Sequence, residues 1–191
     1  MTPVILASTS PYRRMLLERL GVPFSVESPG IDEAEAAGEP PAQRARRLAA
    51  AKAQAVARRH PEAAVIGSDQ VAAAGELILE KPASVARARE QLAALSAAEA
   101  YFYTACTILA PTGFRAAHLD RTRVVFRQLS IEEIERYVAR ERPLDCAGGF
   151  KAEGLGIALF EHLESSDPTA LIGLPLIWVA AMLRRLGHAV P

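Results

Sequence analysis

Apolar and polar residues follow one another in segments that predict strands and helices in alternation. Short apolar runs predict strands, and we expect them at 4–8, within 22–33, and at 64–69, 77–82, 101–110 and 121–129. Helical spacing bounded by Ser, Pro and Gly signals predicts helices at about 11–20, 41–60, 84–95, 130–138 and 175–186. This interleaving indicates an α/β or mixed α+β fold with one main sheet.

The Gly-rich segment 146–156 shows neither the helical nor the strand spacing of apolar residues, and it is predicted to be extended. In an extended chain, Lys151 and Glu153 would share one face. The neighbouring glycines would let a ligand approach the backbone, or they would form a tight structural turn. The next segment, 157–164, fits a helix and a strand equally well.

Length and charge limit the classes of protein. The 191 residues suit a single domain, 1–191, or one domain with two lobes; the formal net charge is 0, whereas nucleic-acid binders usually carry a basic excess. No apolar run reaches the roughly 18 residues of a membrane span, and the first charges follow the first apolar run instead of preceding it as in a secretory signal. We therefore expect a cytoplasmic protein.

The spacing of Cys106 and Cys146 fits no metal site, so we expect buried, reduced thiols.

One acid interrupts an apolar run. Asp69 stands between Ile66 and Val71, where an unpaired carboxylate is costly. It should therefore be paired, metal-bound or catalytic. Lys52 falls within the apolar arc of its predicted helix, so it either extends along the surface or points into a cleft.

The start of the first helix contains hydroxyls and arginines. Ser8 lies in the preceding turn, and Arg13 and Arg14 occupy the first helical turn, where cations are unfavourable unless an anion binds. This arrangement indicates a phosphate site, the alternative being two surface arginines beside a simple cap. Taken alone, Glu33 in an acidic loop and Lys81 before a proline are more typical of solvated surface groups than of a site. Taken together, these acids, lysines and arginines favour metal-assisted phosphate chemistry.

Motifs along nearly the whole chain resemble those of Maf proteins. In order, they are LASTSPYRRMLLERLG, IDE, the helix with Lys52, GSDQV, EKP, AGGFKAEGLG and LIGLPL. The resemblance implies that this chain is a nucleoside triphosphate pyrophosphatase. Such an enzyme hydrolyses the bond between the α- and β-phosphates and requires a divalent cation: Mg, Mn or Co. It also implies an α/β fold with an elongated central mixed sheet flanked by helices, two lobes with a cleft as in inosine triphosphate pyrophosphatases, and a homodimer.

The resemblance also implies roles for individual residues. Asp69 would be catalytic, as proton acceptor for the attacking water or as metal ligand, and Glu33 would help to hold the metal. The residues implied for phosphate binding are Ser8, Arg13, Arg14, Lys52, Lys81 and Lys151.

The segments SDQV and FKAEGLG resemble the branch of the family that prefers 7-methyl-GTP. The resemblance places base specificity at Tyr12, Gln70 and Glu153. A cationic 7-methylguanine ring would be favoured by an aromatic face and a carboxylate, and the Gln70 amide could read a base edge. The expected substrate is therefore a nucleotide, with no nucleic-acid or membrane partner.

Two other readings stay open. The dTTP/UTP branch usually has Asp-Thr where this chain has Asp69-Gln70, and a broad modified-nucleotide pyrophosphatase is the related alternative. Glu80 and Gly149 replace the usual Gly and Ser of the family, which bears on substrate preference and not on reaction type. The more distant reading is a non-catalytic regulator of septum formation.

Overall fold

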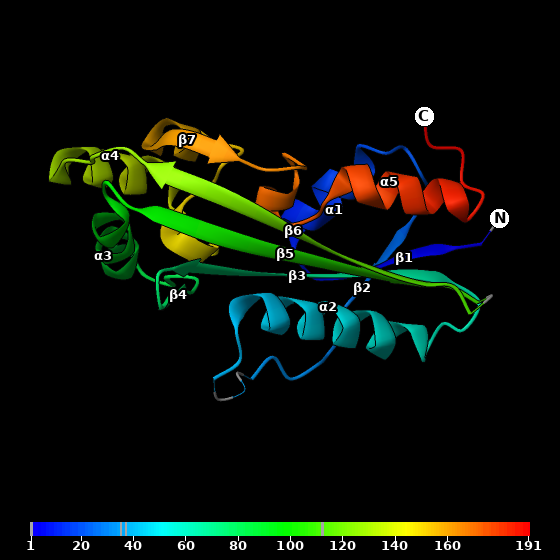
Figure 1. Ribbon diagram of the computed structural model, residues 1–191. Coiled ribbons are helices and arrows are strands. Elements are labelled where there is room, and N and C mark those ends of the chain that lie inside the picture. The colour runs from blue at the N-terminus through cyan, green and yellow to red at the C-terminus, as the bar shows by residue number, and fades with distance from the viewer. Residues whose placement is uncertain (1, 35, 37, 112) are drawn as a thin grey trace. The chain divides into compact units, whose positions relative to one another are not determined.

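The computed structural model describes residues 2–34, 36, 38–111 and 113–191, and its fold is α/β, as predicted. The strands are β1 Val4–Ala7, β2 Ser25–Glu27, β3 Ala64–Ala74, β4 Leu77–Leu79, β5 Glu99–Leu109, β6 Arg115–Phe126 and β7 Phe160–Glu164. The α-helices are α1 Pro11–Glu18, α2 Pro41–Ala57, α3 Val85–Leu95, α4 Ile131–Glu141 and α5 Leu176–Arg185. Figure 1 shows their arrangement.

The strands form one mixed sheet in the order β2-β1-β3-β5-β6-β7, and β4 pairs with β3. β1 runs parallel to both β2 and β3, with Leu6 opposite Ile66. β4 and β7 are antiparallel to β3 and β6. β3 and β4 pair directly on either side of Gly75 and so form a hairpin.

The chain divides into two compact units. The first contains Met1–Gln70, Thr104–Asp120 and Asp167–Pro191, and the second contains Val71–Tyr103 and Arg121–Ser166. The boundary falls within β3, β5 and β6. The predicted cleft between two lobes stays a prediction.

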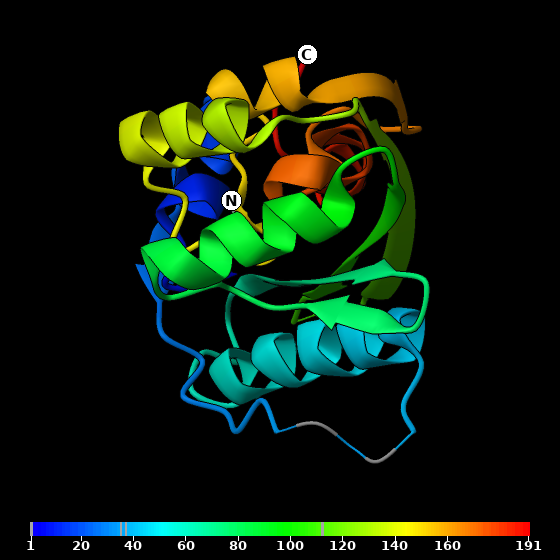
Figure 2. The ribbon, with the colours of Figure 1, turned by 90° about the vertical axis from the view of Figure 1, so that its left-hand side faces the viewer.

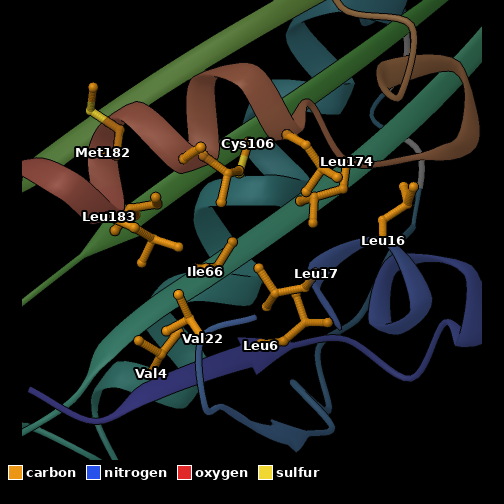
Figure 3. Close-up of a cluster of buried hydrophobic side chains, with 14 of the residues drawn as sticks. Val4, Leu6, Leu16, Leu17, Val22, Ile66, Cys106, Leu174, Met182 and Leu183 are labelled. Carbon is orange, nitrogen blue, oxygen red and sulfur yellow. The ribbon is translucent and has the colours of Figure 1, made fainter. Parts of the chain in front are cut away.

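Alternation along β1 and β3 builds two apolar layers in the first unit. Leu6 and Ile66 pack with α1 and α5 in one cluster (Figure 3). Ile5 and Val65 point the other way and pack with residues of α2. Because successive strand residues face opposite sides, these runs are apolar on both faces, as in a sheet covered by helices on each side.

Helix α2 lies directly against β3 at Gly67. A Cβ on Gly67 would lie 2.4 Å from the Ala49 carbonyl oxygen and 2.5 Å from the Ala53 amide nitrogen. Ala49 and Ala53 are themselves completely buried. Glycine facing alanine therefore brings the helix backbone onto the strand, which fixes the height of the other α2 side chains above the sheet.

The second unit has an aromatic core. Phe150 packs edge-to-face with Phe102, Phe126 and Phe160, at centroid separations of 5.3, 5.5 and 5.0 Å. α3 and α4 lie side by side in this unit (Figure 2). The serine caps predicted for these helices are present: Ser84 begins α3, and Ser130 forms a capping box with Glu133 at α4.

The prediction of an extended 146–156 segment was wrong. The segment forms the 3-10 turns η1 Ala147–Gly149 and η2 Leu155–Leu159, joined by a turn. Gly148 and Gly149 adopt φ of 78° and 70°, which an extended strand does not allow. Lys151 and Glu153 consequently share no extended face. The ambiguous 157–164 divides at residue 160, where η2 ends and β7 begins.

Several boundaries differ from the sequence predictions. β3 continues five residues beyond Asp69, and β6 begins at 115 instead of 121. Cys106 is buried as expected, but Cys146 is only partly buried. Within the described residues, no helix is both long and apolar enough to cross a membrane.

Candidate active site

The acid that interrupts the apolar run is paired with a buried lysine. Lys52 Nζ lies 2.6 Å from Asp69 Oδ1, and each residue is only 6% exposed. The predicted inward position of Lys52 on α2 is confirmed. Asp69 lies within β3, and not at the end of a strand as the predicted range 64–69 had implied.

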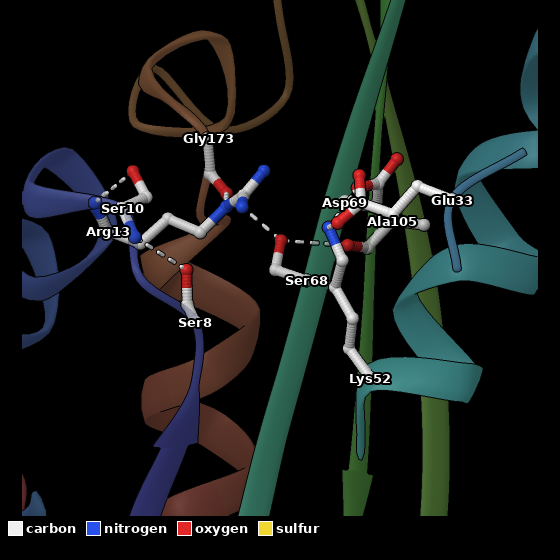
Figure 4. Close-up of polar contacts among 9 residues, drawn as sticks. All are labelled: Ser8, Ser10, Arg13, Glu33, Lys52, Ser68, Asp69, Ala105 and Gly173. Atoms are coloured by element: carbon white, nitrogen blue, oxygen red, sulfur yellow. Dashed lines mark hydrogen bonds and ion pairs between the residues drawn. The ribbon is translucent and has the colours of Figure 1, made fainter. Parts of the chain in front are cut away.

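The same lysine contacts a second carboxylate. Lys52 Nζ lies 2.9 Å from Glu33 Oε1, on the loop before α2, and the Glu33 side chain is 53% exposed. The ammonium group therefore lies between a buried and a solvated acid (Figure 4). These contacts bring together three residues that the sequence had indicated separately.

Burial changes the acidity of Asp69. Desolvation raises the pKa of the Asp69 carboxyl, and the positive charges of Lys52 and Arg13 oppose that rise. A carboxylate with a raised pKa is a stronger proton acceptor near neutral pH. A carboxylate in these surroundings can accept a proton while its charge is compensated by Lys52 and Arg13.

Arg13 is held from the opposite side of β3. Its Nε donates a hydrogen bond of 2.9 Å to the Gly173 carbonyl oxygen. Burial lowers the pKa of the guanidinium, and the carboxylates of Asp69 and Glu33 oppose this effect. Among the described residues, the two terminal nitrogens of Arg13 have no hydrogen-bond partner, so they can bind an anion.

The turn before α1 supplies a buried hydroxyl. Ser8 is 3% exposed, and its Oγ accepts a hydrogen bond of 3.1 Å from the Ser10 amide. Ser10 in turn caps α1 through the Arg13 amide. Arg14 differs from Arg13, because it is exposed and pairs with Glu18 one turn later on the same helix. Arg13 interacts electrostatically with Asp69 and Glu33.

The Gln70 amide is already engaged by the protein. Its Nε2 lies 2.9 Å from Thr104 Oγ1 and 3.0 Å from the carbonyl oxygens of both Ala170 and Leu171. Its Oε1 has no partner among the described residues and can only accept a hydrogen bond. Tyr12 lies half-buried on α1, where the sequence placed it.

The other predicted site residues belong to the second unit. Lys81 is exposed in the irregular segment between β4 and α3, and Glu153 is exposed in the turn before η2. The Lys151 ammonium donates to the Glu141 carbonyl oxygen at the end of α4, and its amide donates to the Tyr137 hydroxyl. Burial raises the pKa of that hydroxyl. In this structure Lys151 thus compensates a helix C-terminus.

Sequence reasoning missed two residues of the site. Ser68 is completely buried, with Oγ 2.8 Å from the Ala105 carbonyl oxygen and 2.9 Å from that of Gly173. Gly173 accepts from both Ser68 and Arg13. Ser68 was visible as a polar residue in an apolar run. The contact of Gly173 with Arg13 spans 160 positions, and no local pattern signals it.

The carboxylates of Glu33 and Asp69 suit a hard divalent cation. Both contact Lys52 Nζ, so their oxygens converge on one point. In the described part of the chain, no three His, Cys, Asp or Glu side chains form a cluster that would hold a metal unaided. Mg²⁺ is commonly bound by one or two carboxylates together with substrate phosphates. The donors therefore fit a cation that arrives with, or is completed by, a phosphate ligand.

The chain matches a protein family model and many curated relatives. Residues 3–186 match the family model described as Maf-like protein. The chain is 52% identical to the 7-methyl-GTP pyrophosphatase of Xanthomonas campestris pv. campestris strain 8004 over all of both chains. It is 50% identical to that of Pseudomonas putida over the same span, and 52% identical to that of Aromatoleum aromaticum over 98% of this chain and 97% of the relative.

Similarity to solved structures is more distant. The Ham1 protein of Staphylococcus aureus aligns with a TM-score of 0.48 and 15% identity, over 81% of this chain and 89% of that chain. Such a likeness is too weak to support an argument about site residues.

Proposed function

This chain belongs to the Maf family, and from that premise we propose that it hydrolyses 7-methyl-GTP to 7-methyl-GMP and pyrophosphate. The observation that carries the proposal is the identity of 50% or more, over both full chains, to proteins named 7-methyl-GTP pyrophosphatase. The reaction breaks the α–β phosphoanhydride bond and adds the elements of water across it.

Asp69 is the proposed proton acceptor. Its burial and raised pKa support that role, because a general base works best when its pKa approaches the working pH. As the attacking water forms its bond to phosphorus, the carboxylate takes the proton. Lys52, in contact with Asp69, would keep the acid ionised beforehand and would bind the substrate phosphates.

The triphosphate would be bound by cations and a hydroxyl from several elements. Arg13 offers its two terminal nitrogens, which match two phosphate oxygens in a bidentate pair. Ser8 lies in the turn before the same helix. Arg14 would contribute less, because it is exposed and already paired with Glu18. Lys81 and Lys151, from the second unit, complete the proposed set.

In the alternative role of Asp69, Glu33 and Asp69 together would hold a divalent cation: Mg, Mn or Co. When bound, such a cation neutralises phosphate charge and orients the scissile bond. The Lys52 ammonium lies at the point on which both carboxylates converge. With such a cation beside these two carboxylates, Lys52 would be available to bind the substrate phosphates.

Base recognition is assigned to Tyr12, Gln70 and Glu153. The ring of Tyr12 and the carboxylate of Glu153 would favour a cationic purine. Because the Gln70 amide nitrogen is engaged by the protein, Gln70 would present its carbonyl oxygen to the donor edge of the base. We place the enzyme in the cytoplasm as a homodimer, and light scattering of the purified protein tests the dimer.

Pyrophosphate release with a nucleotide panel tests the proposal. The panel contains 7-methyl-GTP, GTP, dTTP, UTP and CTP, each with Mg²⁺ and with chelator. We expect metal-dependent turnover with the highest kcat/KM for 7-methyl-GTP. Faster hydrolysis of dTTP or UTP would retain the reaction and overturn the assignment of the base. Absence of turnover with every nucleotide would contradict the enzymatic reading and favour a regulatory one.

A further inference from the structure

The segment from Asp167 to Ile177 is braced by its own buried side chains. The Asp167 carboxylate accepts from the amides of Thr169, at 2.9 Å, and Ile177, at 2.7 Å. The Thr169 hydroxyl accepts from the Leu176 amide at 2.9 Å. Pro175, at the N-cap of α5, makes no side-chain capping bond. The side chains of Asp167 and Thr169 therefore cap the first backbone amides of α5, in place of the N-cap residue. These bonds fix the segment to the start of α5.

The same segment is hydrogen bonded to β3 and α1. Gln70 donates to two of its carbonyl groups. The Gly173 carbonyl oxygen accepts from Ser68 Oγ and from Arg13 Nε, both at 2.9 Å. All these residues belong to the first unit. A short stretch of chain thus joins the strand that carries Asp69 to the helix that carries Arg13.

Gly173 suits this role through its backbone conformation. Its φ is 126°, in the region that favours glycine, and a Cβ there would lie 3.4 Å from Arg13 Nε. The carbonyl can therefore face Arg13 without a side chain pushing the guanidinium away. Since the bond uses Nε, the terminal nitrogens remain available in one orientation, as bidentate phosphate binding requires.

We propose that Asp167 and Thr169 are positioning residues, which hold the Gly173 carbonyl where it orients Arg13 toward the substrate phosphates. This inference rests on the proposed function for the identity of the anion. Arginine loses rotamer freedom when it binds, and a fixed carbonyl removes part of that loss before the substrate arrives. The Gly173 carbonyl oxygen contacts the phosphate-binding residues through Arg13, so its effect on phosphate affinity should vanish when the guanidinium is absent.

A double-mutant cycle tests this dependence. Thr169→Val removes the hydroxyl at nearly constant volume, and Thr169→Ser retains it. We expect Thr169→Val to lower kcat/KM for 7-methyl-GTP by about tenfold or more, because small displacements of binding groups are costly. Thr169→Ser should stay close to the wild type. In an Arg13→Ala background, Thr169→Val should cause no further loss.

The affinity for inorganic pyrophosphate provides a second measurement of the same cycle by calorimetry. Thr107→Val, at another buried threonine of the first unit, controls for general loss of a buried hydroxyl, and thermal unfolding checks each variant. If Thr169→Val does not fold, Ser68→Ala replaces it, since it removes the second donor to the Gly173 carbonyl. The same non-additivity with Arg13→Ala is then expected.

Multiplicative losses in the double variant would overturn the inference, as would unchanged kinetics in Thr169→Val. If the wild type hydrolyses no nucleotide, the proposed function fails, and the cycle on pyrophosphate affinity still decides the inference. A wild type that binds no pyrophosphate and hydrolyses no nucleotide overturns both, because Arg13 would then have no phosphate to face.

Discussion

Lys52 and Asp69 form an ion pair between α2 and β3, with 2.6 Å between Nζ and Oδ1. Both side chains are buried, and Glu33 is the further partner that reaches the same ammonium from solvent. A buried charge that loses its partner destabilises a protein by roughly 3–5 kcal/mol. The proposed catalytic acid is therefore also a charge on which the stability of the first unit depends.

Lys52→Met should lower the free energy of unfolding by about 3–5 kcal/mol at pH 8, and by less at pH 5. Burial already raises the pKa of Asp69, and removal of Lys52 raises it further. Because the folded state then holds its proton more tightly than the unfolded state, the contribution of Asp69 is full below about pH 3.9 and is lost as pH rises through the folded pKa. Urea unfolding between pH 5 and pH 8 measures this.

The exposed Lys81→Met is the matched stability control and should change unfolding little at any pH. Equal losses for Lys52→Met at pH 5 and pH 8 would contradict a pairing whose worth depends on the ionisation of Asp69.

Asp69→Asn should reduce turnover by at least about a hundredfold, because general-base catalysis typically contributes that much or more. The amide keeps an oxygen for Lys52 but cannot take a proton from water. Pyrophosphate release from 7-methyl-GTP measures the loss, and circular dichroism checks the fold. Asp32→Asn makes the same chemical change on the exposed loop beside Glu33 and should retain most of the activity. A near-normal rate for Asp69→Asn would remove Asp69 from the mechanism.

Gly67→Ala should destabilise the protein by about 1–3 kcal/mol, the usual cost of overpacking, and should also reduce activity. The new methyl group would meet backbone atoms of α2 at 2.4 and 2.5 Å, so the helix must move and take Lys52 with it. Combining it with Ala53→Gly should not restore the protein, because the nearest obstacles are backbone atoms. Chemical denaturation and kcat measure both effects, and full restoration in the double variant would show that the contact is with the Ala53 side chain.

His188 should make stability fall in acid. It is buried, and neither ring nitrogen has a hydrogen-bond partner among the described residues. Burial lowers its pKa below the usual 6.5, so the unfolded chain binds the proton more readily. Its contribution to stability is full above pH 6.5 and is lost as pH falls through the folded pKa.

Urea midpoints of His188→Leu between pH 5 and pH 8 test this, since the variant should lose less stability in acid than the wild type. His162→Leu, at an exposed histidine, should keep the wild-type pH dependence. An unchanged acid slope in His188→Leu would exclude His188 as its source.

The sequence predicted those features that are encoded locally. The inward position of Lys52 followed from the helical period, and the beginning of α4 followed from the serine at position 130. The element order followed from alternating apolar runs. Asp69 could be singled out from the sequence because a charged residue is rare inside an apolar run.

Other features depend on residues distant in the chain. No residue near Lys52 in the sequence indicates that its ammonium group would pair with both Glu33 and Asp69. The two carboxylates reach the same ammonium group only in the folded chain. The conformation of the Gly-rich segment was predicted wrongly because glycine permits both an extended and a positive-φ backbone. In the folded chain, Gly148 and Gly149 adopt the positive-φ conformation of turns. The different surroundings of Arg13 and Arg14 likewise arise from Gly173, far along the chain.

The alternation of β3 has a consequence for its evolution. Asp69 faces α2, while Ser68 and Gln70 bond to the segment that follows Asp167. A one-residue insertion or deletion before Gly67 that shifts the strand register would exchange these faces. It would place the acid opposite backbone carbonyls and the hydroxyl opposite an ammonium. These three adjacent residues therefore require a single register of β3. Substitutions in β3 can be tolerated, but an insertion or deletion that shifts this register cannot.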